Sequence, residues 1–168
     1  MADASSYQVA CDTETPVVLV VNGRGASLSL AAVIRGIAEF LPCANVRGVV
    51  LNKTSAAACA YAKPAIEKHT GVAVLGNIPA DDAFSLESRH LGLVTADEVE
   101  QLSARIDKMA ELVEKSVDVD RLLEIAATAS DIREEPYRLE PIAGARPIVA
   151  VARDEAFSFY YEENLQII

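Results

Sequence analysis

The sequence is poor in the residues that build most catalytic and metal sites. Its 168 residues include two histidines and three cysteines. There is no HExxH pattern, no Cys/His cluster at metal-ligand spacing and no GxSxG pattern. We therefore assign no metal ligand and no catalytic residue, and we expect no complete catalytic set within these residues.

Basic residues and long apolar runs are also scarce. Fifteen Lys and Arg residues stand against 25 Asp and Glu residues, which gives a formal net charge of −10. Without a Lys/Arg cluster to neutralise phosphates, a nucleic-acid partner is not expected. No apolar stretch approaches the length of a membrane span, and residues 1–6 have no basic and apolar signal-peptide pattern. We expect a cytoplasmic protein with no membrane partner.

The cysteines are Cys11, Cys43 and Cys59, an odd number with no CxxC pair. Each has small or apolar neighbours in the sequence. We therefore expect three buried free thiols in a reducing compartment.

Three short apolar runs, rich in β-branched residues, predict strands: Pro16–Val21, Val46–Leu51 and Gly71–Leu75. They are apolar on both faces, as in parallel strands covered by helices on each side. Helical spacing predicts a helix over Leu28–Leu41, closed by Pro42, and composition predicts another over Ala56–Thr70. Gly71 is the expected C-cap of the second helix, and Pro64 is expected to start or kink it.

This order of elements, strand–helix–strand–helix–strand, predicts an α/β fold: a partial parallel sheet with flanking helices. A sheet of three strands leaves open edges, so we expect self-association. After it, Ile78–Val94 is expected to be a loop. Thr95–Glu98 is a capping box that would open a long helix, and Asp118 or Asp120 would cap the next one.

The last part of the chain changes character. Ser130–Arg146 is polar, acidic and interrupted by proline and glycine, which predicts a linker over 130–146. Pro147–Ala152 is apolar with strand character, and the residues after it turn helical. A strand and an aromatic cluster that end at residue 168 would have nothing to pack against. We therefore expect a second α/β domain to begin near Pro147 and to be truncated.

Two glycine-containing segments resemble phosphate-binding motifs only in part. Gly23 and Gly25 lie between a strand and a helix, but the third position of a dinucleotide fingerprint is Leu28. A tight turn is the favoured interpretation. Gly48 to Thr54 lacks the glycine that should precede the lysine of a phosphate loop. A phosphate loop is therefore absent.

Asn52 and Lys53 follow a predicted parallel strand, at the edge where open α/β sheets bind ligands. An Asn amide can pair with a donor and an acceptor on a nucleotide base, and the lysine stem can lie over the base. The alternative is that both are ordinary polar surface residues.

Arg89 and His90 form a second candidate pair. An arginine fork and a histidine before a Gly turn can hold a carboxylate. The alternative is an arginine paired with a nearby acidic residue and a histidine in a helix cap. His69, at a predicted helix end, is expected only to complement the helix dipole.

With these residues in view, the chain resembles the cobyrinic acid a,c-diamide synthase family along nearly its whole length. The segments that carry the resemblance are Pro16–Gly25, Gly48–Lys53, Val74–Pro79, Glu87–Val94 and Val149–Tyr161. The first three are shared with other dethiobiotin-synthetase-like ATPases, which have a P-loop NTPase-like fold. Glu87–Val94 and Val149–Tyr161 are more specific to the family.

The resemblance implies an ATP- and Mg²⁺-dependent enzyme that activates acetate carboxylates of a corrinoid and amidates them with ammonia from glutamine. Residues 1–129 would be the carboxy-terminal part of the ATP- and corrinoid-binding domain, and 147–168 the start of a glutaminase domain. Asn52, Lys53, Ile78 and Pro79 resemble the adenine end of the nucleotide site. Arg89 and His90 match a signature on the substrate side.

The resemblance also implies that this chain alone is inactive. The family's phosphate loop and Mg²⁺ ligands would lie before Met1, and the glutaminase triad would lie after Ile168. Two alternatives remain open at this point. One is the related synthase that acts on nickel-sirohydrochlorin, and the other is a non-catalytic α/β binding or regulatory module.

Overall fold

The computed structural model describes residues 5–26, 28–81, 88–89, 92–93, 102–132, 144, 148–154, 157 and 160–167. The chain divides into two compact units, Met1–Ile132 and Arg133–Ile168. The predicted domain boundaries, 1–129, 130–146 and 147–168, stay predictions. The described part contains no helix that is both long enough and apolar enough to cross a membrane.

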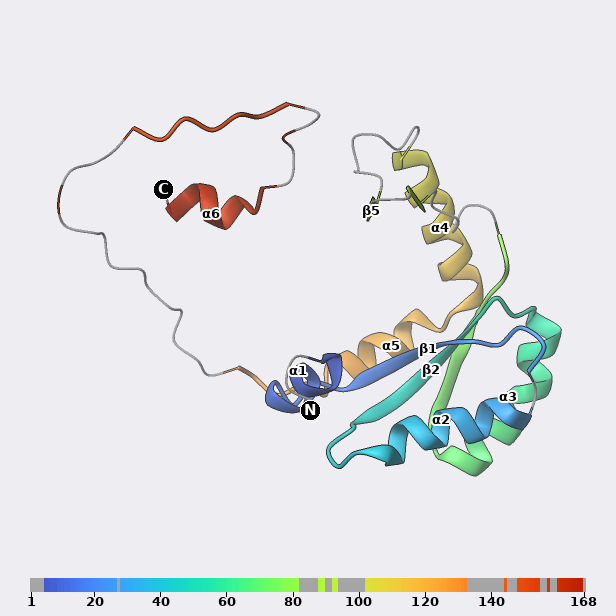
Figure 1. Ribbon diagram of the computed structural model, residues 1–168. Coiled ribbons are helices and arrows are strands. Elements are labelled where there is room, and N and C mark those ends of the chain that lie inside the picture. Colours follow the sequence, from blue (N-terminus) through green and yellow to red (C-terminus); the bar gives the residue numbers. More distant parts are fainter. Residues whose placement is uncertain are drawn as a thin grey trace. The chain divides into compact units, whose positions relative to one another are not determined.

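The first unit is built on a parallel sheet of three strands in the order β1-β2-β3 (Figure 1). The strands are β1 Val17–Asn22, β2 Val46–Asn52 and β3 Ala73–Ile78. All three predicted strands are therefore present, each extended by one to three residues at its carboxyl end. The predicted α/β fold with a partial parallel sheet and flanking helices is confirmed.

Helices α2 Leu28–Phe40 and α3 Ala56–Thr70 cover one face of the sheet (Figure 1). The side chains at the centre of this layer are fully buried: Ile34, Val49, Leu51 and Ile66. Burying such side chains stabilises the fold by about 1.5–3 kcal/mol each. This packing is what holds the two crossover helices against the strands.

The ends of α3 follow the sequence closely, and its interior excludes one of the two alternatives expected at Pro64, a helix start. The Ser55 hydroxyl accepts from the amide of Ala58, and Gly71 takes a left-handed φ of 69° as predicted for the C-cap. No new helix starts at Pro64, because α3 runs through it without interruption. Proline removes one backbone hydrogen bond. The burial of Ala62 and Ile66 on either side keeps the helix continuous.

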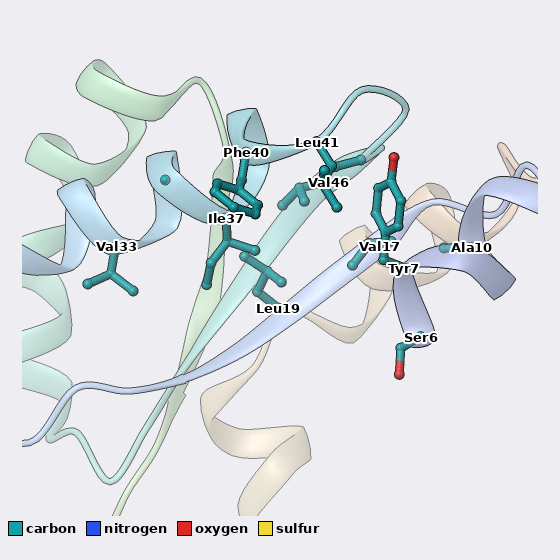
Figure 2. Close-up of a pocket in the computed structure, with 12 residues that line it drawn as sticks. Ser6, Tyr7, Ala10, Val17, Leu19, Val33, Ile37, Phe40, Leu41 and Val46 are labelled. Atoms are coloured by element: carbon teal, nitrogen blue, oxygen red, sulfur yellow. The ribbon is translucent and has the colours of Figure 1, made fainter. Parts of the chain in front are cut away.

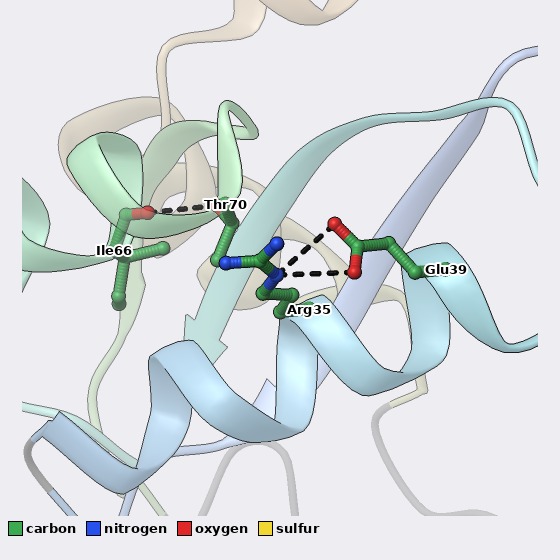
Figure 3. A network of polar contacts seen from close by, with 4 residues as sticks. All are labelled: Arg35, Glu39, Ile66 and Thr70. Carbon is green, nitrogen blue, oxygen red and sulfur yellow. Dashed lines mark hydrogen bonds and ion pairs between the residues drawn. The ribbon is translucent and has the colours of Figure 1, made fainter.

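Polar contacts on the outside of this layer are local. Arg35 Nε lies 3.0 Å from both carboxylate oxygens of Glu39, one turn along α2, and the Thr70 hydroxyl donates to the carbonyl of Ile66 at 2.7 Å (Figure 3). Both members of the ion pair are more than half exposed. Such a pair contributes only about 0.3–0.5 kcal/mol. The apolar layer beneath it therefore dominates the energetics.

The opposite face is covered by the carboxyl-terminal end of α4 Leu102–Ser116 and by α5 Val119–Ala126. Val117 and Ile125 pack there on Val50 and Leu75. The carboxylate of Asp118 accepts from the amide of Arg121 at 2.9 Å, which confirms the first of the two predicted caps.

A short helix, α1 Ser6–Asp12, precedes the sheet and corrects the cysteine prediction. Cys11 and Cys43 form a disulfide with a Cα–Cα separation of 5.9 Å, and neither is fully buried. Beside it, the Tyr7 hydroxyl donates to the carbonyl of Pro42. The expectation of three buried free thiols is therefore wrong for this pair and confirmed for Cys59, which is free and buried.

The segment after β3 contains a two-strand antiparallel pair, β4 Ser88–Arg89 with β5 Gly92–Leu93. The loop expected over Ile78–Val94 therefore includes strand residues at both of these places and at Ile78 itself. The predicted capping box at Thr95–Glu98 lies outside the described residues.

The second unit contains one helix, α6 Glu162–Ile167, among its described residues. The helical tendency expected after residue 153 is confirmed over that range. The strand expected over Pro147–Ala152 is not formed, since the described residues 148–152 carry no strand pairing. A strand exists only through hydrogen bonds to a neighbouring strand, so apolar β-branched composition alone does not produce one.

Candidate ligand site at the carboxyl edge of the sheet

The carboxyl ends of the three strands meet at one edge of the sheet. Asn22 is in register with Asn52, and Asn52 with Ile78. The turns that follow the strands therefore lie next to one another. In open α/β sheets this edge is where ligands bind.

The backbone carbonyl of Asn52 joins the first two strand ends. It accepts from the amide of Gly23 at 2.8 Å and from the hydroxyl of Thr54 at 3.0 Å. Thr54 is only 5% exposed. The first turn is thereby fixed against the second.

A buried asparagine joins the second and third strand ends. The side-chain amide of Asn77 donates to the carbonyl of Thr54 at 2.8 Å, and the amide of Thr54 donates to the carbonyl of Ile78 at 3.1 Å. Asn77 is 7% exposed. Sequence reasoning missed both Asn77 and Thr54. For Asn77 the available signal was a polar residue that interrupts an apolar strand just before its end.

Asn52 and Lys53 lie at this edge, where the sequence predicts them. The side-chain oxygen of Asn52 accepts from the amide of Lys53 at 2.9 Å, and Lys53 takes a left-handed φ of 54°. No described group accepts from the side-chain NH₂ of half-buried Asn52. The Lys53 side chain is exposed beside it.

The turn after β1 confirms the tight-turn interpretation of the two glycines. The amide of Ala26 donates to the carbonyl of Gly23 at 3.2 Å, and Gly25 has a φ of 69°. The amide of Arg24 is already bonded to the side-chain oxygen of Asn22 at 3.1 Å. With its amides used in this way, the turn is not a phosphate-binding nest.

Ile78 and Pro79 lie at the same edge and are half-buried. Ile78 also packs against the apolar cluster beneath α5. Beyond them, the Asp81 carboxylate lies 3.0 Å from the Lys108 ammonium group, which ties the start of the next loop to α4. Asn52, Lys53, Ile78 and Pro79 are thus brought together by the fold.

The second candidate pair is described only in part. Arg89 is paired through its backbone with Gly92 in the small antiparallel sheet. Its side chain and His90 lie outside the described residues. His69 lies, exposed, in the last turn of α3, the position expected for a residue that complements the helix dipole.

The groups that a ligand could reach at this edge are the side-chain amide of Asn52 and the exposed Lys53, because the Thr54 hydroxyl and the Asn77 amide are buried and bonded to backbone carbonyls. In the described part of the chain, no three His, Cys, Asp or Glu residues are grouped so that they could hold a metal ion. These groups fit a neutral heterocycle such as a nucleotide base. They do not fit the phosphates and Mg²⁺ of ATP, which need a Gly-rich loop and carboxylate or hydroxyl oxygen ligands.

A separate apolar groove of about 530 Å³ lies at the other end of the sheet, near the first residues of β1 and β2. Figure 2 shows Leu19 of β1, Ile37 and Phe40 of α2, and Tyr7 of α1 around it. Its lining is almost entirely apolar. This groove therefore differs in chemistry and position from the carboxyl edge.

Known proteins resemble the chain along nearly its full length. A Listeria innocua protein named cobyrinate a,c-diamide synthase is 37% identical over 167 residues, which is 99% of this chain. Proteins of the same name from Methanosarcina acetivorans and Clostridium acetobutylicum are 39% and 41% identical over 98% and 91% of it. The chain belongs to the cobyrinate a,c-diamide synthase family.

The chain matches only part of the length of these relatives. It spans 37% of the length of the Listeria innocua relative and 35% of the Methanosarcina acetivorans and Clostridium acetobutylicum relatives. No family model matches the chain, and no solved structure matches it significantly.

Proposed function

We propose that this chain is part of an ATP- and glutamine-dependent synthase that amidates the a and c acetate carboxylates of cobyrinic acid. The observation that carries the proposal is the 37–41% identity to cobyrinate a,c-diamide synthases along 91–99% of the chain. The relatives' shared name supports a corrinoid substrate over nickel-sirohydrochlorin. It also supports an enzyme over a non-catalytic module.

In this proposal the carboxyl edge of the sheet holds the base of the nucleotide. The NH₂ of Asn52 donates to an acceptor on the base, and the stem of Lys53 lies over the ring. Ile78 and Pro79 supply apolar contacts on the following loop. The support is that all four residues lie at the ends of adjacent strands, with a donor and an exposed lysine beside each other.

Arg89 and His90 act on the substrate side in the same proposal. An arginine fork can hold one of the acetate carboxylates in place, and a histidine can donate a second hydrogen bond. ATP phosphates and Mg²⁺ belong to the whole synthase. Because the described residues do not fit those groups, we assign no residue of this chain to them.

The chain alone has no turnover in this proposal and binds nucleotide weakly at most. In phosphoryl-transfer enzymes the nucleotide's phosphates are held and positioned by a lysine, Mg²⁺ and backbone amides. Contacts to the base without these phosphate contacts therefore give little affinity. Isothermal titration with MgATP is expected to show no saturation in the micromolar range. A micromolar dissociation constant would contradict this part.

The activity itself is tested in a chimera. The matching segment of the Listeria innocua relative is replaced by this chain, and amidation of cobyrinic acid is measured with ATP and glutamine. We expect diamide product from the chimera. A folded chimera that binds cobyrinic acid without amidating it would contradict the proposed function.

The nucleotide assignment is tested in the same chimera. We expect Asn52→Ala to raise the KM for ATP several-fold and to leave the KM for glutamine unchanged. Lys68→Ala, an exposed lysine in the last turn of α3, is the matched control and should change neither. Equal effects on both substrates would remove Asn52 from the nucleotide site.

A further inference from the structure

Thr54 links the ends of the three strands. Its hydroxyl donates to the carbonyl of Asn52 at 3.0 Å, and its amide donates to the carbonyl of Ile78 at 3.1 Å. Its own carbonyl accepts from the Asn77 side chain at 2.8 Å. The hydroxyl also lies so close to Gly23, in the turn after β1, that a Cβ atom there would overlap it. The amide, the carbonyl and the hydroxyl of this buried residue therefore all bond within the chain.

The Thr54 hydroxyl bonds to the peptide group between Asn52 and Lys53. The carbonyl of this peptide accepts a second hydrogen bond, from the amide of Gly23 at 2.8 Å. Its N–H group donates to the Asn52 side-chain oxygen at 2.9 Å. The peptide is thus held at both ends, in an orientation that gives Lys53 its left-handed φ of 54°. A residue with a Cβ atom keeps such a conformation only where the surrounding contacts impose it.

The same peptide group sets the orientation of the Asn52 side chain. A side-chain amide has an oxygen that accepts hydrogen bonds and an NH₂ group that donates them. Because the oxygen accepts from the N–H of Lys53, the NH₂ group of Asn52 is held in one direction. If the peptide turned over, the N–H would move away and the side chain would rotate freely. The direction of the NH₂ group therefore depends on the Thr54 hydroxyl, through a single peptide group.

The strain at Lys53 opposes this orientation, and the hydrogen bonds to the peptide favour it. Thr54 and Gly23 are both buried, so water cannot easily replace the hydroxyl as a donor to the carbonyl between them. Loss of the hydroxyl would leave this carbonyl with one donor in place of two. The peptide would then shift toward orientations in which Lys53 is not strained, and the constraint on the Asn52 side chain would be lost.

We propose that Thr54 is a positioning residue for the nucleotide base. Its hydroxyl holds the peptide between Asn52 and Lys53, and this peptide holds the Asn52 NH₂ group in the direction in which it donates to the base. The inference rests on the proposed function, which places the base at Asn52. Thr54 itself makes no contact with the nucleotide, because its hydroxyl is buried and already bonded. It acts only through the groups that it holds.

The test uses the chimera with the Listeria innocua relative. Thr54→Val removes the hydroxyl and nearly keeps the shape of the side chain, whereas Thr54→Ser keeps the hydroxyl. We expect Thr54→Val to raise the KM for ATP about threefold or more and to leave kcat and the KM for glutamine unchanged, because binding energy common to the ground and transition states is lost. Thr54→Ser should keep the KM for ATP within about twofold of the value for the unchanged chimera.

Ser55→Ala is the matched control, because Ser55 is the next residue and also uses its hydroxyl to hold the backbone. The Ser55 hydroxyl accepts from the amide of Ala58 at 3.3 Å and caps α3. Its loss destabilises the helix end but leaves the peptide between Asn52 and Lys53 in place. The KM for ATP should therefore not change in Ser55→Ala. If Thr54→Val and Ser55→Ala have the same effect on this KM, Thr54 has only a structural role and the proposal is overturned.

Hydrogen exchange on the full chain tests the constraint without any assay of activity. The amides of Gly23 and Lys53 both donate to Asn52, so their exchange should become at least about tenfold faster in Thr54→Val. The amide of Ala58 should speed up only in Ser55→Ala. Unchanged exchange of the Gly23 and Lys53 amides in Thr54→Val overturns the proposal.

The same chimera separates this inference from the proposed function. If Asn52→Ala raises the KM for ATP and Thr54→Val does not, the base site stands and the positioning role of Thr54 is overturned. If Asn52→Ala leaves the KM for ATP unchanged, the nucleotide assignment is overturned, and the positioning role falls with it. A higher KM for ATP in Asn52→Ala and in Thr54→Val, with Thr54→Ser and Ser55→Ala unchanged, supports both.

Discussion

The side-chain amide of Asn77 donates to the backbone carbonyl of Thr54 at 2.8 Å, although both residues are more than nine-tenths buried. This bond joins the turn after β2, which follows Asn52 and Lys53, to the end of β3. The candidate site therefore depends on a polar contact inside an apolar layer. A buried carbonyl that loses its donor costs about 1–3 kcal/mol.

Replacing Asn77 tests this contact. We expect Asn77→Ala to lower the free energy of unfolding by about 1–3 kcal/mol in urea denaturation. Asn22→Ala is the control, because Asn22 ends β1 at the same edge of the sheet but is exposed. The Asn22→Ala variant should lose less than about 1 kcal/mol of unfolding free energy. Equal losses in the two variants would show that burial of the Asn77 bond is not the cause.

The apolar pattern of the sequence was sufficient to predict the sheet and its crossover helices, because burial on both faces leaves a clear signature in strands such as Val46–Leu51. It also located Asn52 and Lys53, since they follow a strand directly. It did not locate Thr54 and Asn77. Their importance comes from contact between residues 23 positions apart, which no local pattern records.

The errors have the same physical origin. The disulfide joins residues that are 32 positions apart and meet only after α1 docks beside the turn following α2. The strand expected over Pro147–Ala152 needs a partner that local composition does not supply. The helix α3 continues through Pro64 because its neighbours are buried. In each case a tertiary contact, or its absence, decides against the local preference.

A second prediction concerns the close approach of Gly23 to Thr54. A Cβ atom at position 23 would overlap the Thr54 hydroxyl, while the backbone of Gly23 is not left-handed. Gly23→Ala should therefore cost about 1–3 kcal/mol of unfolding free energy through overpacking alone. Adding Thr54→Ala removes the overlapping oxygen. The double variant should lose less than the sum of the two single losses. Additive losses would contradict this origin.

A third prediction uses the left-handed conformation of Lys53. In this conformation a residue with a Cβ is disfavoured by about 1–2 kcal/mol. A glycine avoids this strain, but it also raises the conformational entropy of the unfolded chain, which cancels part of the gain in stability. Lys53→Gly should raise the free energy of unfolding by about 0.5–1 kcal/mol. Lys53→Ala removes the charge and keeps the strain, so it should bring no gain. Equal stabilities of the two variants would show that the strain is relieved elsewhere.

A fourth prediction concerns the disulfide between Cys11 and Cys43. It closes a loop of 32 residues, and opening it should lower the free energy of unfolding by about 3–4 kcal/mol. Because α1 has no fully buried residue, proteases should also cut near α1 once the bond is open. Cys11→Ser alone and the double variant with Cys43→Ser should lower the free energy of unfolding by the same amount. Reductant should not destabilise either variant further. A clear additional loss of unfolding free energy in reductant would contradict the pairing of Cys11 with Cys43.

The last prediction concerns Cys59, which is 6% exposed. Burial raises the pKa of its thiol; Lys63 offsets part of this rise, and Glu67 adds to it. The folded pKa therefore exceeds the unfolded one, and stability is lost as pH rises from the unfolded thiol pKa toward the folded value. Cys59→Ala should lack this part of the alkaline decline in unfolding free energy. In the native chain a thiol reagent at pH 8 should label Cys59 only after urea is added, because the reactive thiolate is both rare and covered. Rapid labelling without urea would contradict the buried position.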